Sequence, residues 1–308
     1  MSDREFYSRG KLLISGEYLV LSGAKALAVP LNLGQKMVVT QGPVAGVLFW
    51  ETYVKENIWF KAAYQMASLD IIDATDDNTA RFVQKLLKAG TRFNPTILKK
   101  TSGIHVRNDI EFDITWGLGS SSSLISNLAW WFGADLYKYY RELYKGSGYD
   151  VFCARSDKAM IYSLQDDKPV VHRIDFNPDF SGHLYFVYLG KKQDSQESVK
   201  QFRDQVTTYG ELIREISAIT DQMVNAITLE EFSELMRMHE KLISSVIKID
   251  PVKERLFVDF PGEIKSLGAW GGDFILAASP LNYNEVKDYF SQKNFHVIFN
   301  WKDLVFHQ

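Results

Sequence analysis

A short run of glycine and serine, set between an extended charged segment and an apolar helical pattern, constrains this chain most. Residues 116–124 are W-G-L-G-S-S-S-S-L, and apolar side chains follow at helical spacing. Two glycines let the backbone turn tightly, and the serines stand where a helix begins, with unpaired N–H groups and the positive end of the helix dipole. The run therefore predicts an anion site suited to the phosphates of a nucleotide.

The same run has a plainer interpretation. Glycine and serine are common in loops, and serine is a common residue at the start of a helix. The run is not a Walker A loop, because no Gly-Lys-Ser/Thr follows it. Taken alone, it leaves both interpretations open.

Composition limits the classes of protein to consider. With 308 residues, 46% hydrophobic and 24% charged, the chain is typical of a globular protein with two domains or one large one. A net charge of −3 without a basic stripe argues against nucleic-acid binding. No apolar run has the length of a membrane helix, and residues 1–9 lack the apolar core of a secretion signal.

The cysteine and histidine content limits the classes of protein further. The single cysteine, Cys153, excludes an intramolecular disulfide and suits the cytoplasm. No His/Cys cluster has the spacing of metal ligands, so structural zinc is not expected. We therefore expect a cytoplasmic protein with no membrane or nucleic-acid partner.

The pattern before the Gly-Ser run is rich in strands. Periodicity, glycine and proline predict strands at 11–21 (broken at residues 15–17), 26–31, 34–40 and 103–112, a hairpin of 47–53 with 57–61, and a helix at 76–90. Pro30 is expected to split two of the strands, and Gly90 to stop the helix.

Helices and strands also alternate after the run. The helix that follows it contains Trp130 and Trp131 and is expected to be buried on most sides. Further helices are predicted at 135–144, between 198 and 247, and at 284–292, with strands at 158–164, 169–174, 183–189, 274–278 and 295–299. We expect an α+β protein with one domain at 1–180 and a second at 181–308.

Four segments in order carry a family resemblance. They are G-K-L-L-I-S-G-E-Y at 10–18, the Gly-Ser run, G-S-G-Y-D at 146–150 and G-A-W-G-G-D at 268–273. Their order and spacing resemble the GHMP kinase superfamily, above all its mevalonate and phosphomevalonate kinase branch and the bacterial GYDIA group. The resemblance covers nearly the whole chain. It implies a two-domain fold, with an N-terminal domain like ribosomal protein S5 domain 2 and a ferredoxin-like C-terminal domain.

The resemblance also implies a nucleotide site. In the family the Gly-Ser turn wraps the phosphates of ATP, and its second serine contacts Mg²⁺, a role that matches Ser121. The residues that match this turn are Gly117, Leu118, Gly119, Ser120, Ser121 and Ser122. The family aspartate matches Asp150 as the base for the acceptor hydroxyl, and the family lysine matches Lys11, whose charge would stabilise the developing alkoxide.

Four further residues match the substrate side of the family site: Glu17, Gly148, Gly271 and Gly272. Considered one by one, the polar residues have ordinary explanations as well. Lys11 fits a solvated lysine at the start of a strand, Glu17 a turn residue, and Asp150 a helix N-cap.

The chain departs from the family pattern in two places that bear on function. Trp270 interrupts the third glycine run, where a bulky indole could narrow the site or cover the nucleotide. The magnesium-binding glutamate of mevalonate kinases has no match, because Glu142, the nearest acid, has the wrong spacing.

These features favour a kinase that uses ATP and Mg²⁺ to phosphorylate mevalonate or phosphomevalonate in isoprenoid precursor synthesis, as a monomer or homodimer. Three alternatives stay open: a GHMP kinase for a sugar or homoserine, a nucleotide-binding protein without catalysis, and a related decarboxylase.

Overall fold

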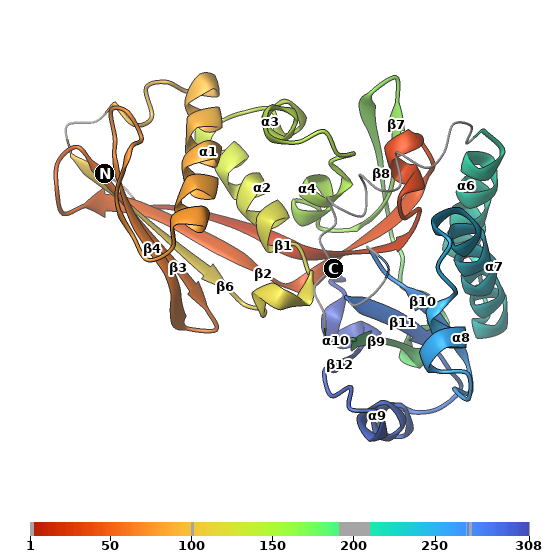
Figure 1. Ribbon diagram of the computed structural model, residues 1–308. Helices are drawn as coiled ribbons and strands as arrows, with labels where there is room; N and C mark the ends of the chain where they lie inside the picture. The colour runs from red at the N-terminus through yellow and green to blue at the C-terminus, as the bar shows by residue number, and fades with distance from the viewer. Residues whose placement is uncertain (1–2, 100–101, 191–209, 269, 271–272, 308) are drawn as a thin grey trace. The chain divides into compact units, whose positions relative to one another are not determined.

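A computed structural model describes residues 3–99, 102–190, 210–268, 270 and 273–307. This part of the chain forms two compact units, each assembled from several stretches of sequence (Figure 1). The first unit comprises Met1–Gly10, Leu33–Ile114 and Leu118–Arg155, and the second comprises Lys11–Asn32, Thr115–Gly117 and Ser156–Gln308. The division of the sequence at residue 180 remains a prediction.

The first unit is a sheet with helices on one face. Its strands follow the order β5-β4-β3-β6-β2, with β1 also paired to β2. Strand β3 runs parallel to β6, whereas the pairs β2–β6, β3–β4 and β4–β5 are antiparallel. The bounds are β1 Arg4–Ser15, β2 Ala26–Gly42, β3 Val47–Val54, β4 Asn57–Gln65, β5 Ile71–Ala74 and β6 Gly103–Ile110; residues 11–15 of β1 and 26–32 of β2 belong to the second unit. The helices are α1 Asp77–Phe93, α2 Ser120–Phe132, α3 Leu136–Leu143 and α4 Tyr149–Ala154.

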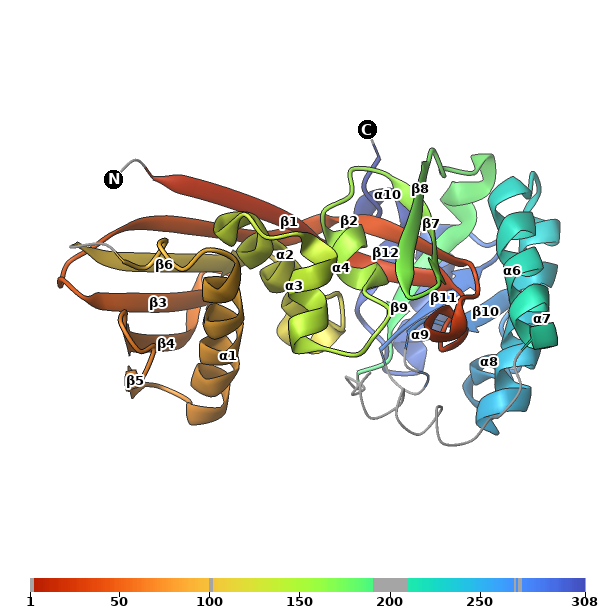
Figure 2. The same ribbon diagram turned by 90° about the horizontal axis from the view of Figure 1, so that it is seen from above.

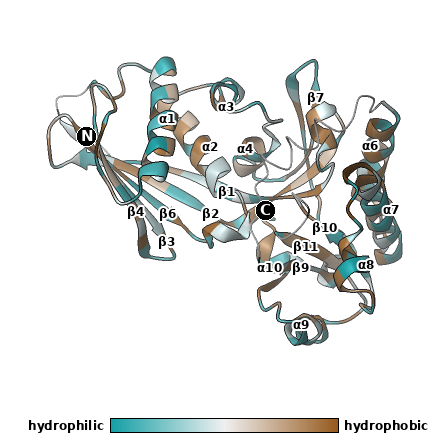
Figure 3. Cartoon of the chain, in the orientation of Figure 1, coloured by the Kyte–Doolittle hydropathy of each residue, from teal (hydrophilic) through white to brown (hydrophobic). Residues whose placement is uncertain are grey.

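One core joins these helices to the sheet. Alternate residues of the strands, such as Val39, Trp50 and Val106, pack against apolar residues of α1 and α2. Figure 3 shows the contrast between the two helices: α2 is largely hydrophobic, whereas α1 has a hydrophilic outer side. The expected burial of α2 holds for Trp131, but Trp130 is half exposed.

Two sequence expectations for this region are wrong in instructive ways. Gly90 does not stop α1, which runs on to Phe93. A side chain at Gly90 would meet the Phe132 ring at 2.2 Å, so the glycine allows α2 to pack closely.

Pro30 does not split β2. It lies between the stretch that pairs with β7 (Ala159–Gln165) and the stretch that pairs with β6, so its missing N–H removes no bond from either ladder.

The second unit contains a four-stranded antiparallel sheet in the order β10-β11-β9-β12. Its strands are β9 Leu184–Tyr188, β10 Glu263–Ser266, β11 Phe274–Ala278 and β12 Ile298–Asn300; β7 and β8 (Lys168–Ile174) form a hairpin that pairs with the start of β2. The helices are α6 Gly210–Asn225, α7 Leu229–Ile247, α8 Val252–Leu256, α9 Tyr283–Gln292 and α10 Trp301–Leu304, with 3-10 turns at Leu19–Ser22, Ile114–Trp116 and Asp179–His183.

In this unit α6 and α7 pack side by side, and α7 lies beside β10 (Figure 2). The α+β fold class is confirmed. The hairpin of β3 with β4 and the strand at Phe274–Ala278 form as predicted. No helix in the described ranges combines the length and apolar character that crossing a bilayer needs.

Candidate active site

The Gly-Ser turn has the backbone that its sequence predicts. Gly117 and Gly119 have φ values of +69° and +94°, a region that favours glycine, and α2 begins directly after them at Ser120. The first helical bond runs from the Ser123 amide to the Gly119 carbonyl, so the amides before Ser123 have no partner within the helix. A helix N-terminus of this kind attracts anions.

The serines of this turn differ in their surroundings. Ser121 is exposed and Ser120 is half-buried, whereas Ser123 is buried and donates to Gln35 and to backbone carbonyls. The Ser122 hydroxyl donates to Asp150 Oδ2 at 2.6 Å. Leu118 is fully buried, and its contact with a nucleotide remains a prediction. The resemblance implies that Ser122 binds the nucleotide, whereas the structure shows its hydroxyl bonded to Asp150.

Asp150 is fixed at the start of α4 by local backbone geometry. Gly148, with φ +83°, is the N-cap of this short helix and Asp150 is its second residue, so Asp150 is not the N-cap that its sequence context allowed. Its Oδ2 accepts the Ser122 hydroxyl, while its Oδ1 is buried without a hydrogen-bond partner among the described residues. A carboxylate with one oxygen held and one unused can accept a proton from a bound molecule.

The half-buried phenol of Tyr144 lies in the field of this carboxylate. Burial raises the pKa of Tyr144, and the charge of Asp150 raises it further. The phenol therefore stays neutral at physiological pH.

Lys11 reaches the other end of the Gly-Ser turn. It lies within β1, half-buried, and its Nζ donates to the Gly117 carbonyl at 3.3 Å. It is therefore not a solvated lysine at a strand start. Lys11 belongs to the second unit and Asp150 to the first, so the pairing of these two charges remains a proposal.

Aromatic packing in the second unit holds the residues that directly precede the Gly-Ser turn. The Trp116 ring packs edge-on against Phe299 and Phe274, with centroids 5.5 and 6.4 Å apart, and Tyr188 donates to the Thr115 carbonyl. Asp273 lies beside the same turn: a side chain at Gly117 would meet its carboxyl carbon at 2.9 Å. Position 117 thus requires glycine because Asp273 approaches it closely and because its φ is positive.

The third glycine segment is the loop between β10 and β11. Gly268 has φ +69°, and the Leu267 amide bonds the Phe274 carbonyl at 3.0 Å. Gly271 and Gly272, predicted to lie near the substrate, are outside the described residues. Trp270 is 4% exposed and packs with Tyr18, Leu19 and apolar residues of α6 and α7, so its indole does not cover a nucleotide.

Glu17 is inside the second unit. Its carboxylate is 1% exposed, pairs with the Lys265 ammonium, and lies 3.2 Å from His239 Nε2. Lys265 and His239 were not predicted as site residues; their only sequence signal is a charged residue within an apolar pattern. A substrate contact by Glu17 remains a prediction.

Burial dominates the protonation of the residues around Glu17. It raises the pKa of Glu17 against the opposing Lys265 ammonium, and it raises the pKa of Glu240 to about 8. It also lowers the pKa of His239 well below the usual range. Since Lys265 hydrogen-bonds Glu17, we assign the charge to Glu17 and the proton to Glu240 at neutral pH.

The oxygens near the turn suit a hard cation held mainly by a nucleotide. Among the described residues no group of three or more His, Cys, Asp or Glu could hold a metal. Mg²⁺ at nucleotide sites commonly takes one or two protein oxygens together with phosphates and waters. The exposed Ser121 hydroxyl fits that donor set.

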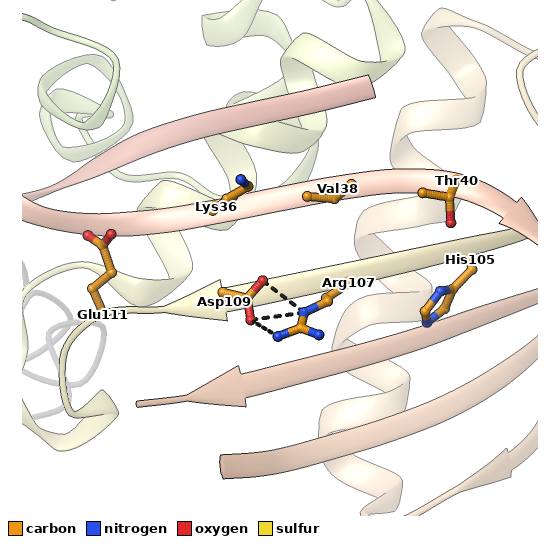
Figure 4. A pocket seen from close by; sticks show the side chains of 7 residues that line it. All are labelled: Lys36, Val38, Thr40, His105, Arg107, Asp109 and Glu111. Carbon is orange, nitrogen blue, oxygen red and sulfur yellow. Dashed lines mark hydrogen bonds and ion pairs between the residues drawn. The ribbon is translucent and has the colours of Figure 1, made fainter. Parts of the chain in front are cut away.

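A hollow of about 400 Å³ lies elsewhere, on the open face of the first unit's sheet (Figure 4). Its charged side chains are paired with neighbours: Arg107 with Asp109 at 2.8 Å, Lys36 with Glu5 at 2.8 Å, and His105 with Glu51 at 3.3 Å. No predicted site residue lines it. We regard it as a solvated sheet face.

Comparisons with known proteins identify the fold. No protein-family model and no curated protein matches the sequence. Solved structures do match over whole chains. The mevalonate kinase of Methanococcus jannaschii is 16% identical, with a TM-score of 0.72 and coverage of 100% of this chain and 99% of that one.

Two further structures extend the comparison. Streptococcus pneumoniae phosphomevalonate kinase, in complex with phosphomevalonate and AMPPNP, is 15% identical, with a TM-score of 0.67 and coverage of 99% and 98%. Lactococcus lactis galactokinase, complexed with galactose, is 12% identical, with a TM-score of 0.67 and coverage of 97% and 92%. The chain therefore has the fold of these GHMP kinases, as the resemblance implied.

Proposed function

We propose that the chain is an ATP-dependent, GHMP-type small-molecule kinase whose acceptor is mevalonate or phosphomevalonate. One observation carries the proposal. Asp150 is bonded to Ser122, the third residue of α2, so a carboxylate with an unpartnered oxygen lies within one turn of a helix N-terminus suited to phosphate. The fold shared with mevalonate, phosphomevalonate and galactose kinases supports this reading.

The residues of the turn would bind the nucleotide. Backbone amides at the start of α2 would bind the terminal phosphates, and the two glycines keep side chains away from them. Lys11, bonded to the Gly117 carbonyl, would bring its charge to the same phosphates. Mg²⁺, with Ser121 as its protein ligand, would neutralise charge on the β- and γ-phosphates.

Transfer to a hydroxyl acceptor would proceed in line. The acceptor oxygen forms a bond to the γ-phosphorus, the bond from that phosphorus to the bridging oxygen breaks, and its electron pair leaves with ADP. Asp150 Oδ1 takes the hydroxyl proton, while Ser122 holds Oδ2. If the acceptor is the phosphate of phosphomevalonate, no hydroxyl proton is removed and Asp150 positions the acceptor instead.

The acceptor is tested by a panel. ADP release from Mg-ATP is measured with mevalonate, phosphomevalonate, homoserine and galactose, and the product mass is determined. Turnover on one of the first two supports the proposal; turnover on galactose or homoserine keeps the kinase and changes its acceptor. Binding of AMPPNP without turnover on any of the four favours a nucleotide-binding protein without catalysis.

A further inference from the structure

The third glycine segment is held at its first end by a buried lysine. Lys265 on β10 is 0% exposed, and its Nζ donates to the Glu17 carboxylate and to the Ser266 carbonyl, the latter at 2.9 Å. Two residues later the chain enters the loop at Leu267 and Gly268. Whatever fixes Lys265 therefore fixes the start of this loop.

Glu17 ties the turn after β1 to that loop. One oxygen of its carboxylate accepts from Lys265, and the second oxygen lies 3.2 Å from His239 Nε2. Both of these residues lie in the second unit. Since Glu17 is 1% exposed, an acceptor could touch it only after this cluster had opened.

The same turn and strand are both anchored on α7. The Gly16 amide donates to His239 Nε2 at 3.0 Å, and the Ser266 amide donates to Glu240 Oε1 at 3.0 Å. His239 Nε2 is thus an acceptor, which assigns the ring proton to Nδ1. Helix α7 lies beside β10 in Figures 1 and 2.

The turn needs such contacts because its own backbone is unfavourable. Gly16 has φ +89°, and a side chain there would meet Ala26 Cβ at 2.6 Å. Tyr18, with a full side chain, has φ +62°. A non-glycine residue holds this conformation only where its surroundings compensate for the strain.

We propose that Glu17 is a positioning residue that joins the turn after β1 to the third glycine segment, rather than a contact to the acceptor. The inference rests on the proposed kinase function, because it assigns the loop a part in that site. The Glu17 carboxylate bonds Lys265, two residues before the loop, and Trp270 of the loop packs with Tyr18 and Leu19 of the turn. The turn that follows the Lys11 strand and the loop beside Gly117 are thus held together. Loss of this carboxylate frees the loop and leaves Lys265 as an unpaired buried cation.

The test compares three variants with the wild-type protein. Glu17→Gln removes the charge and keeps the shape, and Glu17→Gln with Lys265→Met also removes the unpaired ammonium. Glu263→Gln is the matched control, because Glu263 is a buried carboxylate on the same strand that pairs with Arg237 and Lys253 instead. Thermal midpoint, amide hydrogen exchange over residues 263–276, and the separate kcat and KM values are measured.

We expect Glu17→Gln to speed exchange in the loop about tenfold or more, and to lower kcat while the acceptor KM stays within about twofold. The control should leave exchange in the loop unchanged. The double variant should recover the thermal midpoint but neither the loop's protection nor kcat. It also keeps the test decisive if the single variant fails to fold.

Two results would overturn the proposal. One is a Glu17→Gln protein with a protected loop and an acceptor KM raised about tenfold, which would make Glu17 an acceptor contact. The other is a double variant that regains loop protection and kcat, which would mean that Glu17 only neutralises Lys265. If the wild-type protein phosphorylates nothing, the proposed function fails, and the exchange data still decide the role of Glu17.

Discussion

Two carboxylates that the sequence brings to the same proposed site have different surroundings. Asp150 is half-buried at the start of a helix and is bonded to a serine hydroxyl, whereas Glu17 is 1% exposed and is paired with the buried Lys265 ammonium. Similar chemistry therefore supports different roles: an acceptor of a proton in the first case and a structural link in the second. Surroundings, not residue type, separate them.

Ser122→Ala tests how Asp150 is held. The change removes the hydrogen bond that Ser122 donates to the Asp150 carboxylate, so kcat should fall by roughly 10- to 100-fold through misplacement of the base. AMPPNP affinity, measured by calorimetry, should change little. Ser126→Ala is the control, because Ser126 is a buried serine one turn further along α2 that bonds Arg155. Weaker AMPPNP binding with kcat intact would instead assign the Ser122 hydroxyl to the phosphates.

At the scale of elements, local patterns predicted the helices and strands better than their ends. The start of α1 was predicted within one residue: Asp76 is its N-cap and accepts from the Thr79 amide, a local interaction. The end of α1 was predicted wrongly because Gly90 is needed for the close contact with Phe132, a residue on another helix. Glycine signals a helix end and a close helix contact equally well.

Gly90→Ala tests that explanation. The added methyl would overlap the Phe132 ring, so the free energy of unfolding should fall by about 1–3 kcal/mol, although alanine is the better helix former. Urea denaturation measures the change. Gly210→Ala, at the first residue of α6 with open space around it, is the control and should be neutral or slightly stabilising. Equal stabilisation by both changes would contradict the close contact.

The contact of α7 with β10 makes stability depend on pH. The pKa of Glu240 is raised from its usual 4.5 to about 8, so the folded state binds the extra proton between these values and stability falls as pH rises through them. His239 acts in the opposite sense: its pKa is lowered, so it costs stability as pH falls below its usual 6.5. Between pH 6.5 and 8 His239 no longer contributes, and Glu240 acts in the same sense as Glu17, whose pKa burial also raises.

Glu240→Gln should therefore flatten the fall in stability between pH 6.5 and 8, which can reach about 1.4 kcal/mol per pH unit for one group. Chemical denaturation at several pH values measures the slope. Glu234→Gln, an exposed acid on the same helix, should keep the wild-type slope. An unchanged slope in Glu240→Gln would show that Glu240 is already ionised in the folded protein.

At the scale of the whole molecule, the four ordered segments predicted the α+β fold, which agrees with solved kinase structures over whole chains. Contacts between distant residues could not be predicted. Lys265 lies 248 residues from Glu17 and His239 lies 223 residues from Gly16, and no local pattern links such pairs. The Ser122–Asp150 bond was missed for a different reason: the resemblance assigned both residues to ligands, not to each other.

The central claim is that Asp150 serves a phosphoryl-transfer site at the Gly-Ser turn. The most direct measurement is ADP release from Mg-ATP with mevalonate and with phosphomevalonate, for wild type and Asp150→Ala, alongside AMPPNP affinity. We predict turnover on one of these acceptors, a loss of about 100-fold or more in Asp150→Ala when the acceptor is a hydroxyl, and unchanged AMPPNP affinity. Wild-type turnover that survives in Asp150→Ala would contradict the central claim, whereas its absence with both acceptors would contradict the proposed acceptor.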